Sequence, residues 1–153
     1  MRIGRDEWGL RLASATALRS TCLRRHVGCV LTDAWGRVLA TGYNGVARGV
    51  AHCNDAVTDG RTVTTYPNAC AGAGMASGTG LDLCEATHAE ANALLQCRDP
   101  DQIETCYVTT APCITCVKLL VNTGCRRVVF EDEYAVSGER LWLSSEGRTW
   151  VRV

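Results

Sequence analysis

The spacing of apolar positions along the chain predicts helices that alternate with strands. Trp8, Leu12, Ala15 and Leu18 recur near helical spacing and mark the apolar stripe of a first helix. The predicted elements are a helix over 6–20, strands over 27–32 and 38–41 joined by a turn at 33–36, a helix over 85–98, a strand over 105–110, a helix over 112–122, a strand over 126–130, a short helix over 137–145 and a strand over 149–153. This alternation predicts an α/β sandwich with a partly parallel sheet, in one domain over residues 1–153.

Residues 44–82 show little periodicity and are rich in Gly, Ala, Asn, Asp and Thr. A loop of this length is uncommon in a compact domain unless it is functional or pinned. Its stretch CAGAGMASGTG, residues 70–80, contains glycines without the G-x-G-x-x-G spacing, and no predicted strand leads into it. A dinucleotide site is therefore not supported there.

The bulk composition excludes several classes of protein. The 153 residues contain 16 Lys plus Arg and 16 Asp plus Glu, so a strongly basic face for duplex nucleic acid is not suggested. No apolar run approaches the ~18 residues of a membrane span, and the start MRIGRDEWGL does not resemble a signal peptide. We therefore expect a cytoplasmic protein. Ten cysteines in a reducing compartment are more often metal ligands than disulfides when they cluster.

Three residues form a candidate metal site. Cys113 and Cys116 follow Pro112, which favours the first turn of a helix, so both thiols can face one ion. Helix N-termini also favour thiolates. His88, near the start of the preceding predicted helix, is the third candidate ligand. Zinc takes thiolate and imidazole ligands, and a catalytic zinc has three protein ligands and leaves a fourth position for water.

Glu90 lies two residues after His88, so the two point ~200° apart on an ideal helix. They can share a site only across the N-terminal end of that helix, where residues 85–87 are predicted to form the first turn. A carboxylate beside a zinc ion can take a proton from the activated water and pass it to a substrate. H-x-E followed by P-C-x-x-C is the signature of zinc-dependent deaminases, in which the glutamate is the acid/base and not a ligand.

Two other interpretations of the signature stay open. The first is a purely structural zinc with Glu90 in solvent. The second is a redox pair of Cys113 and Cys116, which leaves His88 and Glu90 unexplained. The order of the two motifs, each opening a helix with a strand between them, favours the catalytic zinc over both.

Four stretches carry a wider similarity: STCLRRHVGCVL (20–31), ATGYNGVARG (40–49), HAEANALLQC (88–97) and YVTTAPCITC (107–116). Together they resemble the cytidine deaminase superfamily and, more narrowly, the deoxycytidylate (dCMP) deaminases of bacteria and phages. The resemblance implies a three-layer α/β/α sandwich with a five-stranded mixed sheet. It also implies zinc-dependent hydrolysis of dCMP to dUMP and ammonia, which supplies dUMP for thymidylate synthesis.

The resemblance also implies residues that contact the substrate. Asn44 matches a residue that hydrogen-bonds the deoxyribose hydroxyl. Arg24 matches a residue that meets the 5′-phosphate, with Arg25 as its alternative, and a guanidinium suits a phosphate because its fork donates two hydrogen bonds. Tyr134 matches a tyrosine near the base. At Ala111 the chain departs from relatives, which often carry serine, glutamate or an aromatic residue, so dCTP and a 5-substituted dCMP stay open as substrates.

A second, structural zinc is implied in the same way. Cys22 and Cys53 match two ligand positions of such a zinc in some dCMP deaminases. Cys70 and Cys84 lie in or beside the long loop and complete a closed set of four thiolates, unless His52 replaces one of them. The remaining cysteines fall on predicted strand, helix or turn positions and are expected to be small core residues: Cys29, Cys97, Cys106 and Cys125.

Two rival functions and the expected partners complete the interpretation. A deaminase of another base, such as tRNA adenosine, is disfavoured by the balanced charge and the GYNG stretch. A non-catalytic zinc-binding module is disfavoured by the open ligand position beside Glu90. We expect a small nucleotide substrate, with neither duplex nucleic acid nor a membrane as partner. The resemblance further implies a homo-oligomer, with hexamers common among such proteins and dCTP and dTTP as effectors of some.

Overall fold

A five-stranded mixed sheet forms the centre of the protein in the computed structural model, which describes residues 1–61 and 63–153. The strand order is β2-β1-β5-β6-β7, in which β1 is antiparallel to β2 and β5, while β5, β6 and β7 are parallel. The elements are α1 (Arg5–Ala17), β1 (Gly28–Thr32), β2 (Val38–Tyr43), β3 (Val57–Thr58), β4 (Thr64–Thr65), η1 (Leu81–Leu83), α2 (Ala89–Gln96), η2 (Pro100–Gln102), β5 (Thr105–Thr110), α3 (Ile114–Leu120), β6 (Arg127–Asp132), α4 (Glu139–Leu143) and β7 (Thr149–Arg152).

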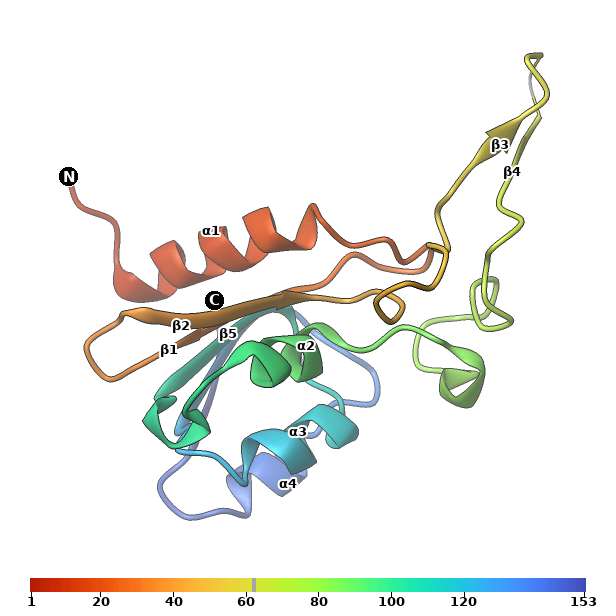
Figure 1. Cartoon of the computed structure of the whole chain (residues 1–153). Helices are drawn as coiled ribbons and strands as arrows, with labels where there is room; N and C mark the ends of the chain where they lie inside the picture. The colour runs from red at the N-terminus through yellow and green to blue at the C-terminus, as the bar shows by residue number, and fades with distance from the viewer. Residues whose placement is uncertain (62) are drawn as a thin grey trace.

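The sheet separates two layers of helices, with α1 on one face and α2, α3 and α4 on the other (Figure 1). Successive side chains of a strand point to opposite faces. In β1, Val30 accordingly packs in one apolar cluster with Leu10 and Ala13 of α1, and Leu31 packs in another with Ala93 of α2. The predicted α/β fold with a five-stranded mixed sheet between helices is confirmed.

The buried face of α1 differs from the predicted apolar stripe. Trp8, Ala15 and Leu18 are exposed, so the stripe was wrong at these positions. The cause is the close approach of α1 to β1 at Gly28, where a Cβ atom would overlap the carbonyl oxygen of Ala13. Small residues permit this approach, and the larger Trp8 and Leu18 lie outside it. The buried residues of the helix are Gly9, Leu10, Ala13 and Ala17.

The α2 helix approaches β2 in the same way at Gly42. A Cβ atom at this glycine would overlap the backbone of Ala89 and Ala93. Because α2 begins at Ala89 and His88 is its N-cap residue, this contact fixes the height of the helix start above the sheet. The packing of one glycine thus determines where His88 lies.

The described part of the segment 44–88, which omits residue 62, contains little regular structure, as the composition of 44–82 predicts. The exceptions are the η1 turn and the short β3–β4 hairpin, which projects away from the sheet (Figure 1). The predicted helix over 85–98 was too long at its start, because Thr87 is extended and exchanges backbone hydrogen bonds of 2.8 and 3.2 Å with Gly45. This pairing brings the two ends of the long segment together.

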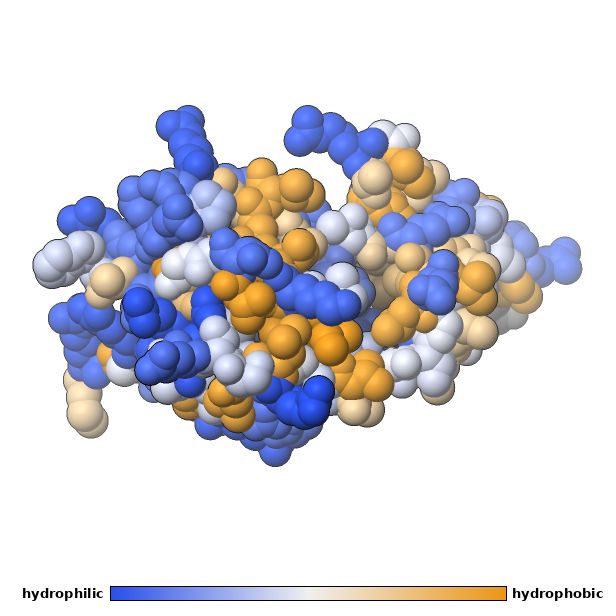
Figure 2. Space-filling view, turned by 90° about the horizontal axis from the view of Figure 1, so that it is seen from below, coloured by the Kyte–Doolittle hydropathy of each residue, from blue (hydrophilic) through white to orange (hydrophobic). Residues whose placement is uncertain are grey.

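The side that carries α3 and α4 is seen in Figure 2, where apolar surface runs between polar groups. Isolated apolar side chains are common on protein surfaces, whereas a contiguous patch often marks an interface. Among the described residues, no helix is long and apolar enough to cross a membrane. The exposed apolar residues of α2, α3 and α4 are Leu95, Ile114, Leu119 and Leu143.

The Gly42 contact yields the first testable prediction. Gly42→Val forces α2 away from the sheet and should lower the free energy of unfolding by about 1–3 kcal/mol, the usual cost of overpacking. Urea unfolding at saturating zinc measures the change. Gly74→Ala is the matched control, because nothing lies within 4 Å of the added Cβ atom. Equal stability of the two variants would show that the contact does not constrain α2.

Candidate metal centre and pocket

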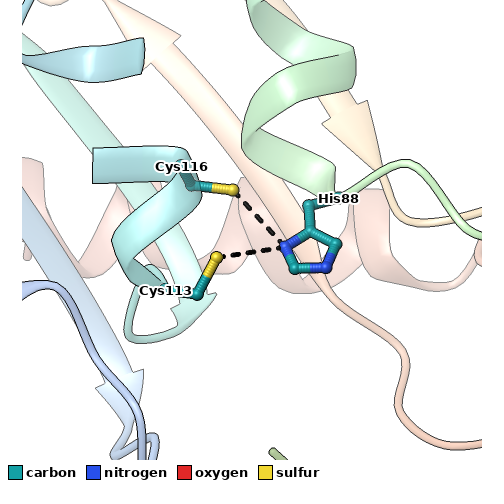
Figure 3. Close-up of side chains that lie close together, drawn as sticks. All are labelled: His88, Cys113 and Cys116. Atoms are coloured by element: carbon teal, nitrogen blue, oxygen red, sulfur yellow. Dashed lines mark hydrogen bonds between the residues drawn. The ribbon is translucent and has the colours of Figure 1, made fainter. Parts of the chain in front are cut away.

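Three side chains that are distant in the sequence meet at the starts of two helices. His88 is the N-cap residue of α2, Cys113 is the N-cap residue of α3, and Cys116 lies in the first turn of α3. His88 Nδ1 is 3.4 Å from Cys113 Sγ and 3.4 Å from Cys116 Sγ (Figure 3). Among the described residues, these three form the group whose ligand atoms all lie within 4.8 Å of one another.

The electrostatics of the group suit a metal ion. The hydrogen bond with Cys116 lowers the pKa of the Cys113 thiol to about 4, and the same bond raises the pKa of Cys116. The hydrogen bond with Cys113 raises the pKa of His88. Cys113 is therefore the member of the group that most readily becomes a thiolate, the form in which cysteine binds a metal ion. Two sulfurs and one ring nitrogen in this arrangement are the donor set of a catalytic zinc with one open position.

Glu90 lies in the first turn of α2, beside the three ligands and outside their cluster. It is 4% exposed, and burial raises the pKa of its carboxyl group. The site lies across the N-terminal end of α2, so His88 and Glu90 both face it despite their two-residue spacing. The helix start that brings them together is Ala89, four residues later than predicted.

A pocket of about 350 Å³ opens directly over this group. Its floor includes His88, Glu90 and Cys113, and one wall includes Ala111. The volume lies within the usual range for small-molecule sites. The substrate-contact candidates named from the sequence line the same pocket: Arg24, Arg25, Asn44 and Tyr134.

Asn44 holds together the segment that carries the arginines. Its Nδ2 donates to the Arg25 carbonyl oxygen at 2.7 Å, and its Oδ1 accepts from the Val27 N–H at 2.8 Å and from Ser20 Oγ at 2.6 Å. An amide nitrogen carries two hydrogens, so one Nδ2–H remains for a ligand. The structure thus gives Asn44 a positioning role that the sequence did not predict.

The arginines and Tyr134 lie at the rim of the pocket. The Arg25 guanidinium lies over the Tyr134 ring, with its Cζ 5.9 Å from the ring centroid. Arg24 Nη2 donates to the carbonyl oxygens of Ala76 and Thr79 at 2.6 and 2.9 Å. The sequence did not predict the part of the pocket wall that accepts hydrogen bonds from Arg24. The length of the irregular segment was the only signal for it. The missed wall residues are Ala73, Gly74, Met75, Ser77, Gly78 and Leu81.

The four cysteines of the predicted second site also gather, although more loosely than the first group. Burial, and to a smaller extent the neighbouring Cys70 and Cys22 sulfurs, raise the pKa values of the Cys53 and Cys84 thiols, so the four side chains lie near one another. Cys22 and Cys53 are buried, and Cys70 and Cys84 are half-buried. His52 is exposed, and its backbone N–H donates to Asp55.

Comparison with known proteins identifies the family. The family model described as "Cytidine and deoxycytidylate deaminase zinc-binding region" matches residues 4–132. A deoxycytidylate deaminase of Mycobacterium phage D29 is 42% identical over 132 residues, which cover 84% of this chain and 94% of the phage protein. The chain therefore belongs to the cytidine and deoxycytidylate deaminase zinc-binding family, and the resemblance found in its motifs is confirmed.

Two further similarities differ in scope. A deoxycytidylate deaminase of Saccharomyces cerevisiae is 36% identical over 99% of this chain, which spans only 45% of the yeast protein. A crystal structure of dCMP deaminase from the cyanophage S-TIM5, in complex with dCMP and dUMP, aligns over 100% of this chain and 99% of that chain. Its TM-score is 0.70 at 21% identity, which shows a common fold. Family and ligand cluster together support one zinc ion in this protein.

The second prediction concerns that zinc. Cys113→Ser removes a ligand and should weaken zinc binding at this centre by at least about 100-fold, more than the loss of an outer hydrogen-bond partner costs. Titration against a chromophoric chelator measures the affinity. Cys97→Ser is the matched control, because Cys97 is a half-buried thiol outside both cysteine groups. If Cys113→Ser bound zinc as the wild type does, the ligand set would be wrong.

Proposed function

We propose that the protein catalyses the zinc-dependent hydrolytic deamination of dCMP to dUMP and ammonia, as one deaminase domain over residues 1–153. The observation that carries the proposal is the buried Glu90 beside a His-Cys-Cys cluster at the floor of a nucleotide-sized pocket. The phage D29 relative is a deoxycytidylate deaminase, which supports dCMP as the substrate.

The chemistry follows from the residues at the floor. His88, Cys113 and Cys116 would hold a zinc ion, which would supply a water molecule of lowered pKa. Glu90 accepts a proton from this water as its oxygen attacks C4 of the pyrimidine, and delivers the proton to N3. A second proton transfer through Glu90 lets the amino group leave as ammonia, and C4 retains the oxygen as a carbonyl. Burial suits Glu90 to this task, because a carboxylate whose pKa is raised is a stronger base toward the water proton than an exposed carboxylate.

Recognition is assigned to the rim. Arg24, or Arg25 as its alternative, supplies positive charge for the 5′-phosphate. The remaining Asn44 Nδ2–H is available to the sugar hydroxyl, and Tyr134 lies where it can pack on the base. All four line the pocket that holds Glu90, which supports this assignment.

A structural zinc on Cys22, Cys53, Cys70 and Cys84 is also part of the proposal. Its support is the closeness of the four side chains and one hydrogen bond. The Cys22 sulfur accepts the backbone N–H of the residue two positions later, Arg24, at 3.4 Å. Such outer hydrogen bonds orient and stabilise thiolate ligands. The cysteine set without His52 is the one proposed.

The remaining expectations concern location and assembly. We propose a cytoplasmic homo-oligomer, with a hexamer as the expected form and dCTP and dTTP as effectors. The exposed apolar side chains on α2, α3 and α4 support association. The family resemblance alone supports the effectors.

The third prediction tests the reaction. Wild-type protein should deaminate dCMP with the highest kcat/KM in an ultraviolet-monitored panel of dCMP, dCTP, 5-methyl-dCMP, cytidine and an RNA anticodon stem. Glu90→Gln should lower kcat by about 10²–10⁴-fold with zinc retained, because the acid/base is lost. Glu146→Gln, at an exposed position, is the control.

Three outcomes of this assay would contradict the proposal. Preference for dCTP or for the RNA stem would replace dCMP as the substrate. Normal turnover by Glu90→Gln would remove Glu90 from the chemistry. A fully zinc-loaded wild type that turned over no cytosine nucleotide would favour the non-catalytic zinc-binding module.

The fourth prediction concerns the structural zinc. Elemental analysis should count two zinc ions per wild-type chain and one per Cys70→Ser chain, since a closed thiolate site loses its ion with a ligand. The Cys70→Ser protein should also melt at a lower temperature, because metal binding at such a site contributes to folding. Cys97→Ser should keep both ions. A single zinc in the wild type would remove the second site.

A further inference from the structure

The stretch from Ala73 to Gly80, called here the 73–80 loop, forms one wall of the pocket without any helix or strand of its own. It is folded by internal turns: the Met75 N–H donates to the Gly72 carbonyl at 3.1 Å, and the Thr79 N–H donates to the Ala76 carbonyl at 3.0 Å. In Figure 1 it belongs to the green coil beside the body of the protein, before α2. Local turns give the loop a shape but do not hold it against the pocket.

One side chain holds it there. Among the described residues, the hydrogen bonds that join the 73–80 loop to the chain outside residues 70–84 all come from Arg24. Its Nη2 donates to the Ala76 oxygen at 2.6 Å and to the Thr79 oxygen at 2.9 Å. A charged donor makes stronger bonds to carbonyls than a neutral one. The closed position of the loop therefore depends on Arg24.

These two hydrogen bonds limit what else the Arg24 guanidinium can bind. A guanidinium presents two edges from which it can donate a pair of parallel hydrogen bonds, the Nε–Nη2 edge and the Nη1–Nη2 edge. Both edges include Nη2, and both hydrogens of Nη2 are used by the loop. Arg24 thus retains only single, divergent N–H groups, and it lacks the fork that makes arginine a selective phosphate ligand.

Arg25 has the opposite character. It is exposed, and its side chain makes no hydrogen bond or ion pair with the part of the chain that the structure describes. Its guanidinium stacks over Tyr134, which orients it without using its donors. Its backbone is fixed by the bond from Asn44 Nδ2. Arg25 therefore offers a complete fork at the rim of the same pocket.

We propose a division of labour between the two arginines: Arg24 is a positioning residue that latches the 73–80 loop as a wall of the pocket, and Arg25 binds the 5′-phosphate and determines the preference for a nucleotide over a nucleoside. This inference rests on the proposed deamination of dCMP. It assigns different work to two adjacent residues of the same type, so substitution separates them.

The fifth prediction compares Arg24→Gln, Arg25→Gln and Arg25→Lys with Arg19→Gln, an exposed arginine outside the pocket. The nucleotide preference is the kcat/KM for dCMP divided by the kcat/KM for deoxycytidine. Arg25→Gln should lower this ratio about 10–100-fold, the value of a charged hydrogen-bonded contact. Arg25→Lys should restore most of it, since an ammonium still binds phosphate as a point charge.

Arg24→Gln should behave differently. Without the latch the pocket wall is lost for both substrates, so both kcat/KM values should fall by a similar factor and their ratio should change less than about threefold. Hydrogen exchange of peptides that cover residues 73–80 should become at least about tenfold faster in Arg24→Gln and stay unchanged in Arg25→Gln and Arg19→Gln. Zinc content and melting temperature verify that each variant is folded.

Two results would overturn the division. A large fall in nucleotide preference for Arg24→Gln, with loop exchange unchanged, would make Arg24 the phosphate ligand. An unchanged preference in Arg25→Gln would remove Arg25 from phosphate binding. If the wild type turns over neither dCMP nor deoxycytidine, the proposed reaction is wrong. Hydrogen exchange of residues 73–80 still shows whether Arg24 holds the loop in place. Calorimetric binding of dUMP against deoxyuridine then decides the role of Arg25 in the same variants.

Discussion

The packing of α2 on Gly42 is the constraint on which the metal centre depends. Because the backbone of Ala89 rests almost directly on β2, the first turn of α2 cannot move without lifting the helix off the sheet. That turn carries both His88 and Glu90. The other two ligand candidates come from α3, which follows a strand buried along its whole length, so its start is equally fixed. The metal-ligand candidates are thus placed on helix starts that packing holds against the sheet, as a precisely built site requires.

The residues proposed to recognise the substrate are held in place in a different way. The arginines, Asn44 and the 73–80 loop lie outside the sheet and are ordered by hydrogen bonds between side chains and backbone carbonyls. Such bonds are individually modest, on the order of 1 kcal/mol net and somewhat more when a charge takes part. A pocket built this way combines a floor held by backbone packing with walls held by side-chain hydrogen bonds. Relatives could change the walls for other substrates and keep the floor.

The five strands were predicted well from the sequence, because short alternating or continuous runs of apolar residues are typical of strands in a sheet that has helices on both faces. The metal group was predicted because thiol and imidazole spacing follows from zinc chemistry. Three features escaped. The buried face of α1 depends on Gly28, which lies in β1. Helical periodicity alone, without this contact, wrongly predicted that Trp8 and Leu18 are buried. The start of α2 depends on the pairing of Thr87 with Gly45, a contact 42 positions apart along the chain. The bonds from Arg24 to the 73–80 loop have no local pattern at all.

The hydrogen bond of 3.1 Å from the Gly72 N–H to the Leu83 carbonyl joins the two ends of the segment that contains the 73–80 loop. The wall of the pocket is therefore a small ring and not a stretch of a long coil. The wall is held at its base by this backbone hydrogen bond and, between Ala76 and Thr79, by the side chain of Arg24. A substitution inside the ring can therefore reshape the pocket without moving the metal-ligand candidates, which lie at the starts of α2 and α3.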